Sequence, residues 1–221
     1  MCGRFSFSAN ERIVEERFDI KVDTDLYKPR YNCAPSQILA VITNNKPTEL
    51  SYLRWGLIPF WAKDMSIGNK LINTKAETIT EKPSFKYAFS KHRCLVLTDG
   101  FYEWKKDKAK TPYHISLRSH KLFAMAGLWE QWKNDDGSLL ESFTIITTEA
   151  NDFMKNIHHR MPVILKIDDE KKWLFENKLP ILQNLLKPYD SNEMIARQVS
   201  KKVNNPINDN ELILLEDNLS L

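Results

Sequence analysis

The sequence has 221 residues, of which 42% are hydrophobic, and a formal net charge of +3. This is enough to bury one large hydrophobic core, or at most two small ones. The sequence has no apolar run of about 18 residues, and its N-terminus lacks the basic and apolar regions of a signal peptide. A cytoplasmic protein without a membrane span is therefore expected.

Charge and cysteine content narrow the class further. From Ile207 to Leu221 there are four acidic residues and no basic ones, so residues 1–206 carry +3 plus 4, or +7. A basic body with six tryptophans is compatible with nucleic acid, although charge alone favours an ordinary solvated surface. The three cysteines suit a reducing compartment and have no metal-binding spacing, so no metal site is predicted.

The N-terminal half reads as strands with short helices. The alternation in CGRFSFS predicts a strand, and the capping-box spacing of Ser8 and Glu11 predicts a helix that continues to about Phe18. YNCAPSQ at 31–37 is typical of a loop. Two strands, ILAVIT and LSYLRWGLI, are expected next, followed by a helix at about 84–91.

The second half adds more strands and helices. Aromatic and β-branched residues predict strands at RCLVLTD, FYEWKK, PYHISL, LFAMAGLWEQW and SFTIITT. Helices are expected at about 150–156, at DDEKKWLFEN with Asp168 as N-cap, and at LPILQNLL. Because the strands come mostly in succession, we predict an α+β fold: a mostly antiparallel, barrel-like core with helices packed outside. We predict a single domain over residues 1–221, with an acidic tail from about 209 to 221.

Cys2 is the first candidate for chemistry. Removal of Met1 would leave a 1,2-aminothiol, with an amine of pKa about 7.7–8.0 and a thiol of pKa about 8.5. The amine can form an imine with an aldehyde, and the thiol can then close a five-membered thiazolidine ring intramolecularly. From the dipeptide alone, a small residue without a role is the simpler interpretation.

Three further motifs carry reactive groups. Glu103 lies among aromatics in DGFYEW, either exposed on a strand face, which is the commoner case, or buried with a raised pKa as a usable acid or base. IHHRMPVIL places His158 and His159 at a loop–strand junction. In LINTKAET, the residues Asn73, Lys75 and Glu77 alternate, as in an extended segment. Asn73 could hold an anion or a sugar hydroxyl and Lys75 a phosphate, although in isolation a polar loop is the simpler interpretation.

The order of the motifs is more specific than any one of them. From end to end the chain contains MCGRF, YNCAPSQ, RWGLIPFWAKD, NTKAET, RCLVLTDGFYEW, IHHRMPVIL and VSKKVNNPINDNELI. This combination resembles the SOS response-associated peptidase (SRAP) family, whose members include abasic-site sensors of bacteria and vertebrates. The resemblance extends from residue 2 to about residue 213.

The resemblance implies a function. After loss of Met1, Cys2 is expected to form a thiazolidine with the ring-opened sugar aldehyde of an abasic site in single-stranded DNA, protecting the lesion in the DNA damage (SOS) response. It also implies autopeptidase and lyase activities. No cofactor and no metal are implied, and we expect a cytoplasmic monomer that associates with the nucleoid when it is bound to DNA.

The resemblance also assigns residues. Cys2 is the expected covalent nucleophile, and Asn73 is expected to position the terminal amine and the deoxyribose. Glu103 is the general acid–base, and His158 protonates the sugar ring oxygen, whereas His159 falls at a variable position. The expected DNA-binding residues are Arg4, Trp61, Lys75 and Arg160.

Two departures and two alternatives accompany this interpretation. Lys75 stands where the family usually has arginine, so the bidentate phosphate contact is lost, and Thr74 replaces the usual alanine.

Class II glutamine amidotransferases also begin with Met-Cys-Gly, although they lack GFYEW and HxRMP. A non-catalytic single-strand-binding module would explain the basic body but leaves Cys2, Glu103 and His158 unused.

Overall fold

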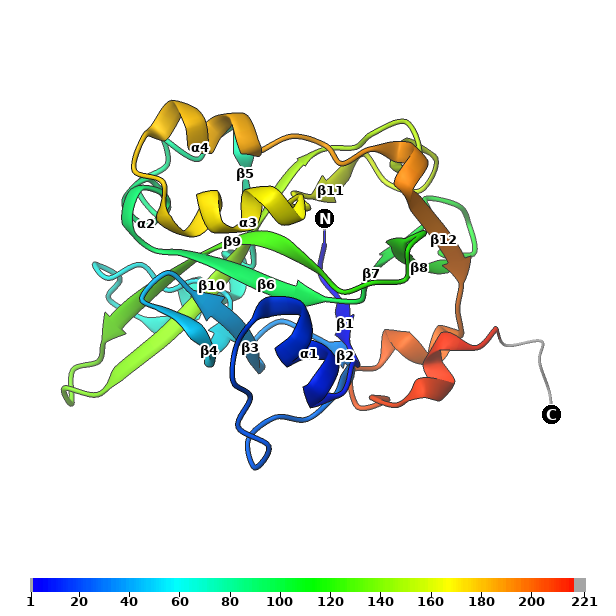
Figure 1. Ribbon diagram of the computed structural model, residues 1–221, viewed down its shortest axis with the longest axis horizontal. Coiled ribbons are helices and arrows are strands. Elements are labelled where there is room, and N and C mark those ends of the chain that lie inside the picture. Colours follow the sequence, from blue (N-terminus) through cyan, green and yellow to red (C-terminus); the bar gives the residue numbers. More distant parts are fainter. Residues whose placement is uncertain (1, 217–221) are drawn as a thin grey trace.

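Two β-sheets with helices around them form the fold (Figure 1). The structure is a computed structural model that describes residues 2–216. Met1 and residues 217–221, which include the end of the predicted acidic tail, lie outside the described residues. The predicted α+β class with a barrel-like core is confirmed.

Five strands close the barrel. They follow one another in the order β10-β4-β3-β6-β9, and β9 pairs back to β10. The neighbouring strands are antiparallel, apart from the parallel pair of β4 and β10. Their bounds are β3 Ile38–Thr43, β4 Lys46–Trp55, β6 Arg93–Thr98, β9 Phe123–Lys133 and β10 Leu139–Glu149.

Two short strands extend the barrel sheet beside β10. β5 (Asn73–Lys75) pairs with β10 in parallel, and β11 (Arg160–Pro162) pairs with it in antiparallel orientation. β5 confirms the predicted extended segment. Thr147 of β10 pairs with Lys75 of β5 and with Pro162 of β11, so the two short strands flank β10 on opposite sides.

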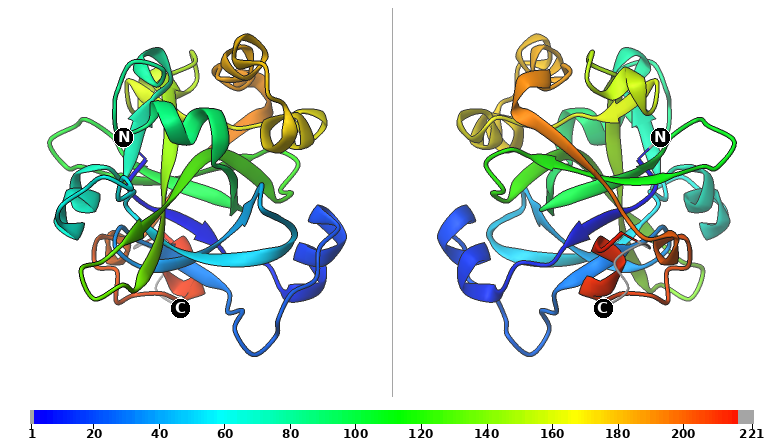
Figure 2. Two further views of the ribbon diagram at one scale, coloured as in Figure 1. Left: turned by 90° about the vertical axis from the view of Figure 1, so that its left-hand side faces the viewer. Right: turned by 90° about the vertical axis from the view of Figure 1, so that its right-hand side faces the viewer.

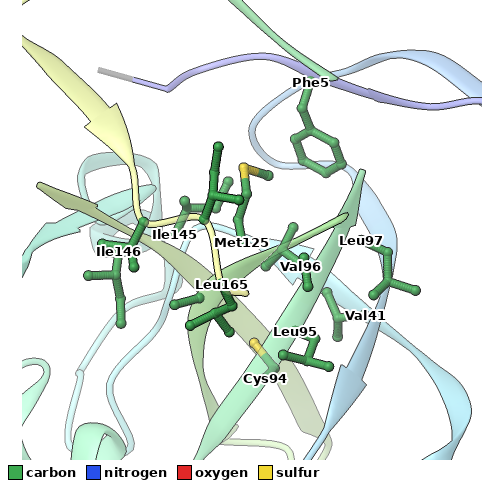
Figure 3. Close-up of a cluster of buried hydrophobic side chains, with 14 of the residues drawn as sticks. Phe5, Val41, Cys94, Leu95, Val96, Leu97, Met125, Ile145, Ile146 and Leu165 are labelled. Atoms are coloured by element: carbon green, nitrogen blue, oxygen red, sulfur yellow. The ribbon is translucent and has the colours of Figure 1, made fainter. Parts of the chain in front are cut away.

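The barrel interior is filled by aliphatic and sulfur-containing side chains. Figure 3 shows Val41, Val96, Met125 and Ile145 gathered from four different strands. All four are fully buried, as is Cys94 beside them. Cys94 therefore acts here as a small apolar core residue.

The second sheet carries the N-terminus. Its order is β12-β8-β7-β1-β2, with antiparallel pairing throughout. Strand β1, which lies between β7 and β2, confirms the predicted N-terminal strand. β12 was not predicted, and β2 occupies part of the predicted loop. The bounds are β1 Phe5–Phe7, β2 Arg30–Cys33, β7 Gly100–Trp104, β8 Pro112–Leu117 and β12 Met194–Gln198.

The Asp99–Gly100 step carries the chain from the barrel into the second sheet, so it is not a hairpin turn. The Asp99 carboxylate accepts hydrogen bonds from the Ser6 hydroxyl and from both the backbone N–H and the hydroxyl of Ser8. A side chain at Gly100 would collide with His114, since a Cβ there would lie 2.2 Å from its Nε2. Glycine is required at position 100 because β7 and β8 pack so closely there.

The engagement of Ser8 shifts the start of the first helix. α1 (Glu11–Phe18) begins after Asn10, whose side chain accepts a hydrogen bond from the Ile13 N–H at 3.0 Å. The predicted Ser8 cap is wrong because its hydroxyl bonds Asp99 instead.

The remaining helices lie around the outside of the strands (Figure 2). α3 begins one residue before the predicted cap, Asp168, which lies in its first turn. The buried guanidinium of Arg93 donates to the carbonyls of Trp173, Leu174 and Glu176, which satisfies the C-terminal end of α3. The helices are α2 Lys86–Lys91, α3 Ile167–Phe175 and α4 Leu179–Leu185, and the helix predicted at 150–156 is reduced to the 3₁₀ turn Met154–Asn156.

The C-terminal segment packs beside β2 (Figure 1). It contains two 3₁₀ turns, η5 (Lys201–Asn204) and η6 (Glu211–Leu214). Between them, the Asp209 carboxylate accepts backbone N–H bonds from Tyr31 at 2.6 Å and Asn32 at 2.8 Å. Within residues 2–216, no helix has both the length and the apolar content that a membrane crossing needs.

Candidate active site around Cys2

Strand β1 determines where Cys2 lies. The pairing of β1 with β7 continues upstream of Phe5, because the Tyr102 N–H donates to the Arg4 carbonyl at 2.9 Å. Cys2 therefore lies beside the end of β7 that carries Glu103. Its side chain is fully buried, with the sulfur 4.0 Å from the Arg4 carbonyl oxygen. Burial raises the pKa of the Cys2 thiol well above its usual value, and the nearby Glu103 carboxylate adds to this.

Asn73 holds the backbone of Cys2. It is the first residue of β5, and its Nδ2 donates to the Cys2 carbonyl at 2.8 Å. Its Oδ1 is buried and has no hydrogen-bond partner within the described residues. A buried carbonyl oxygen without a partner can accept a hydrogen bond from an amine or a sugar hydroxyl.

Glu103 adopts the less common of its two predicted environments. Glu103, on β7, is a buried residue with 3% of its surface exposed, and burial raises the pKa of its carboxyl group. A carboxyl group with a raised pKa exchanges protons closer to neutral pH than an ordinary glutamate does.

His158 faces this carboxyl group from the loop before β11. Its Nδ1 lies 3.9 Å from Glu103 Oε1 and accepts the Arg160 N–H at 3.0 Å. The same Nδ1 lies 3.2 Å from the Arg160 carbonyl oxygen, to which the tautomer with a proton on Nδ1 can donate. Burial lowers the pKa of His158, so the ring is mainly neutral at pH 7. His159 is exposed, with its Nδ1 3.1 Å from Lys106 Nζ.

Two of the four expected DNA-binding residues are engaged within the protein. Arg160 is buried and forms a bidentate pair with Glu77 at 2.7 and 2.9 Å, and it donates to the Thr147 carbonyl at 2.7 Å. Arg4 Nη1 donates to Asn32 Oδ1 at 2.8 Å and to the Val203 carbonyl at 2.6 Å.

The other two expected DNA-binding residues are available on the surface. Lys75 is exposed at the end of β5, and Trp61 is 47% exposed on the loop after β4. Trp55, the other tryptophan of this motif, is instead fully buried in the core. The surface tryptophan therefore offers exposed side-chain area, whereas the buried one has a packing role.

Sequence reasoning missed the residues that hold the arginines. Glu77 was conspicuous only as the third member of an alternating set with Asn73 and Lys75, and nothing linked it to Arg160. The partners of Arg4 come from β2 and from the C-terminal segment, which are far apart in the chain.

Among residues 2–216, no group of three or more His, Cys, Asp or Glu side chains is arranged to bind a metal ion.

On this α+β barrel, an asparagine holds a buried cysteine near the N-terminus, and a glutamate–histidine pair lies beside it. These features define a class of protein, and sequence comparison finds the same class. The family model of the SOS response associated peptidase (SRAP) matches residues 1–206. The chain therefore belongs to the SRAP family, and the resemblance is confirmed.

Several relatives support this assignment. The chain is 51% identical to the abasic site processing protein YoaM of Bacillus subtilis, with 99% of each protein covered. It is 32% identical to the abasic site processing protein HMCES of Xenopus tropicalis, covering 84% of this chain and 65% of that protein. A crystal structure of a Bacteroides thetaiotaomicron protein matches with a TM-score of 0.89 and 32% identity, over 97% of this chain and 99% of the other.

Proposed function

We propose that this protein processes abasic sites in single-stranded DNA by covalent attachment through Cys2. The observation that supports this most directly is the hydrogen bond of Asn73 to the Cys2 carbonyl beside the buried Glu103. The relatives named as abasic site processing proteins, at about half identity, support the same substrate. In this proposal the protein is a cytoplasmic monomer, and it associates with the nucleoid when it is bound to DNA.

The proposed reaction starts with loss of Met1, since an acylated nitrogen cannot form an imine. Hydrolysis of the Met1–Cys2 amide consumes one water and frees the amine. That amine adds to the aldehyde carbon of the ring-opened deoxyribose, and water leaves to give the imine. The thiol sulfur then bonds to the imine carbon, and its proton ends on nitrogen as the thiazolidine closes.

Burial explains why such a reaction needs neighbouring acids and bases. The raised pKa keeps the Cys2 sulfur as a thiol at neutral pH, so a base must take its proton as the ring closes. Glu103 is the proposed base, and it returns the proton when the cross-link reverses. His158, with its lowered pKa, is a strong acid in its protonated form and is proposed to protonate the sugar ring oxygen.

The remaining parts of the proposal concern DNA contacts and further activities. Trp61 and Lys75 are proposed to contact a base and a phosphate directly. Arg4, which bonds neutral protein acceptors, is proposed to add positive potential. Arg160 is proposed to contribute to the DNA-binding surface through its bidentate pair with Glu77. The proposal also includes autocatalytic removal of Met1 and lyase cleavage at the lesion.

A denaturing gel tests the covalent step. Wild-type protein mixed with single-stranded DNA that carries one abasic site should give a heat-resistant shifted band, and Cys2→Ala should give none. Cys33→Ala is the matched control because it also removes a buried thiol, from β2. Intact-mass measurement should show that the reactive preparation has lost Met1.

Two outcomes would contradict this proposal. One is a wild-type protein without Met1 that forms no band, and the other is a Cys2→Ala variant that still forms it. Glutamine hydrolysis by the same preparation would point to an amidotransferase instead. Salt-sensitive binding without any covalent product would point to a passive single-strand-binding module.

A further inference from the structure

Phe60 and Tyr87 form an exposed aromatic pair that the site around Cys2 does not use. Phe60 is 55% exposed on the loop after β4, and Tyr87 is 46% exposed on α2. Their rings contact each other edge to face, with centroids 5.4 Å apart. The contact gathers their exposed apolar surface into one patch, and burying that patch against a ligand would be favourable.

Tyr87 of this pair is packed on one side. The ring of Tyr87 contacts His92 at 5.3 Å, and His92 stacks on the largely buried Trp129 at 4.5 Å. His92 is fixed in turn by its hydrogen bond to Glu130 at 2.9 Å. We call Phe60 and Tyr87 the aromatic platform. Because Tyr87 is already packed in this way, a ligand that stacks on the platform costs little entropy at this side chain.

The surroundings of the platform are positively charged. Residues 60–91 contain six lysines and three acidic residues. Two of those acids are engaged, because Glu77 pairs with Arg160 and Asp64 bonds the backbone and hydroxyl of Ser66. The lysines are all exposed: Lys63, Lys70, Lys75, Lys82, Lys86 and Lys91. Aromatic rings among lysines match the bases and phosphates of an unpaired strand, whereas a second copy of this surface would be repelled.

The platform lies away from Cys2 but within reach of the same strand. Figure 1 shows α2 at one end of the molecule and the N-terminal end nearer the middle. The Leu57 N–H bonds the Leu71 carbonyl at 3.2 Å, and these residues lie close in sequence to Phe60 and Asn73. At about 3.6 Å per extended residue, the backbones of Phe60 and Asn73 are within roughly 25 Å of each other. A stacked strand that rises about 3.4 Å per nucleotide covers this distance in about eight nucleotides.

We propose that the aromatic platform stacks an unpaired base of the DNA strand whose abasic site reacts at Cys2, several nucleotides to one side of the lesion. This rests on the proposed function and deepens it: the substrate is an abasic site with an extended single-stranded flank. Stacking tolerates any base, so the platform favours strand length and not sequence.

Flank length tests the proposal. An oligonucleotide with two nucleotides on each side of the abasic site is compared with two others, each extended by ten nucleotides on the 5′ or the 3′ side only. For the wild type, the second-order cross-linking rate should rise with one of the two extensions. On that extended oligonucleotide, the double variant Phe60→Ser, Tyr87→Ser should react about tenfold more slowly than the wild type. On the short oligonucleotide the two proteins should react at the same rate. Leu139→Ser, which removes an exposed apolar side chain at the β9–β10 hairpin, should behave as the wild type.

A second readout separates failure of this inference from failure of the proposed function. Affinity of the Cys2→Ala protein for undamaged single-stranded DNA at fixed salt needs no cross-link. It should fall about tenfold when both platform residues are replaced. Equal flank dependence and equal affinity with and without the platform would overturn the inference and would leave its aromatic surface to a protein or membrane partner. Absence of any cross-link, with the affinity difference preserved, would overturn only the covalent function.

Discussion

Burial determines the protonation of the three titratable groups at the site. It raises the pKa of the Cys2 thiol and of the Glu103 carboxyl, and it lowers the pKa of the His158 imidazole. Each shift favours the neutral form, because a charge is poorly solvated inside the protein. The three groups therefore stay uncharged over a wider pH range than they would in water. This suits a reaction that moves protons between sulfur, nitrogen and oxygen.

The raised pKa of Glu103 predicts a pH limit for cross-linking. As pH falls through this pKa the carboxylate gains a proton and can no longer accept one, so the rate should fall at a higher pH than an ordinary glutamate would set. Glu103→Gln should slow single-turnover cross-linking by about a hundredfold and remove this acid limb. Rates measured from pH 4.5 to pH 8 check this, with the exposed Glu16→Gln as control.

Stability measurements separate this catalytic role from a structural one. At neutral pH, ionisation of the buried Glu103 carboxyl opposes folding, since a raised carboxyl pKa contributes stability only at low pH. Glu103→Gln removes that cost, so its thermal midpoint at pH 7 should equal or exceed that of the wild type. A lower midpoint together with a slower reaction would contradict the assignment and indicate misfolding.

At the scale of elements, the site depends on the register between β1 and β7. Cys2 lies three residues before β1 and Glu103 lies on β7, and the Asp99 carboxylate accepts hydrogen bonds from Ser6 and Ser8 at the start of β7. Thr98 adds a hydrogen bond from its hydroxyl to the Ser6 carbonyl at 2.8 Å. These polar groups lie at the opposite end of β7 from Glu103, and they fix the strand that delivers the nucleophile.

Loss of the Asp99 carboxylate should loosen this register. Asp99→Ala leaves the N–H of Ser8 and two hydroxyls without their acceptor, which should destabilise the protein by about 2–3 kcal/mol. It should also slow cross-linking while leaving affinity for undamaged DNA unchanged. Denaturant unfolding and the gel assay measure both effects, and Asp152→Ala, which breaks an exposed ion pair, should alter neither. Weaker DNA binding in Asp99→Ala would contradict a role confined to the β1–β7 register.

The same contacts explain which elements could be predicted. β3, β6, β9 and β10 were predicted because buried barrel strands need runs of apolar and β-branched residues. The predicted Ser8 cap was wrong because the Ser8 hydroxyl belongs to a contact between distant segments of the chain. β12 was missed because it has only one buried residue, Met194, and so lacks a strong apolar pattern. Local patterns therefore predict elements, whereas tertiary hydrogen bonds decide their ends and connections.

At the scale of the whole molecule, the site is assembled from four distant segments. No spacing rule links these segments. They are the residues before β1 with Cys2, β5 with Asn73, β7 with Glu103, and the loop before β11 with His158. The resemblance to the SRAP family was needed to connect them in advance. The geometry of Arg4 also depends on the C-terminal segment, through the Val203 carbonyl. The sequence alone could not show this, because the contact joins the two ends of the described chain.

His114 links the stability of the whole molecule to pH. It lies on β8, with its Nε2 2.8 Å from the Ser6 hydroxyl and its ring against Tyr102. Burial lowers its pKa from 6.5 to about 4, and Arg197 acts in the same direction while Asp99 opposes it. Between these pKa values the unfolded chain binds a proton that the folded chain does not, so stability is lost as pH falls from about 6.5 to about 4.

The loss attributable to His114 should reach about 3 kcal/mol, since each pKa unit corresponds to about 1.4 kcal/mol. For a protein of this size that corresponds to a decrease in thermal midpoint of about 5–10 °C between pH 7 and pH 4. His114→Gln cannot gain a proton, so its midpoint should decline less over this range even if it starts lower at pH 7. Scanning calorimetry of both proteins gives the difference directly and cancels the carboxyl groups that they share. Parallel curves for the two proteins would show that His114 is protonated equally in the folded and unfolded states.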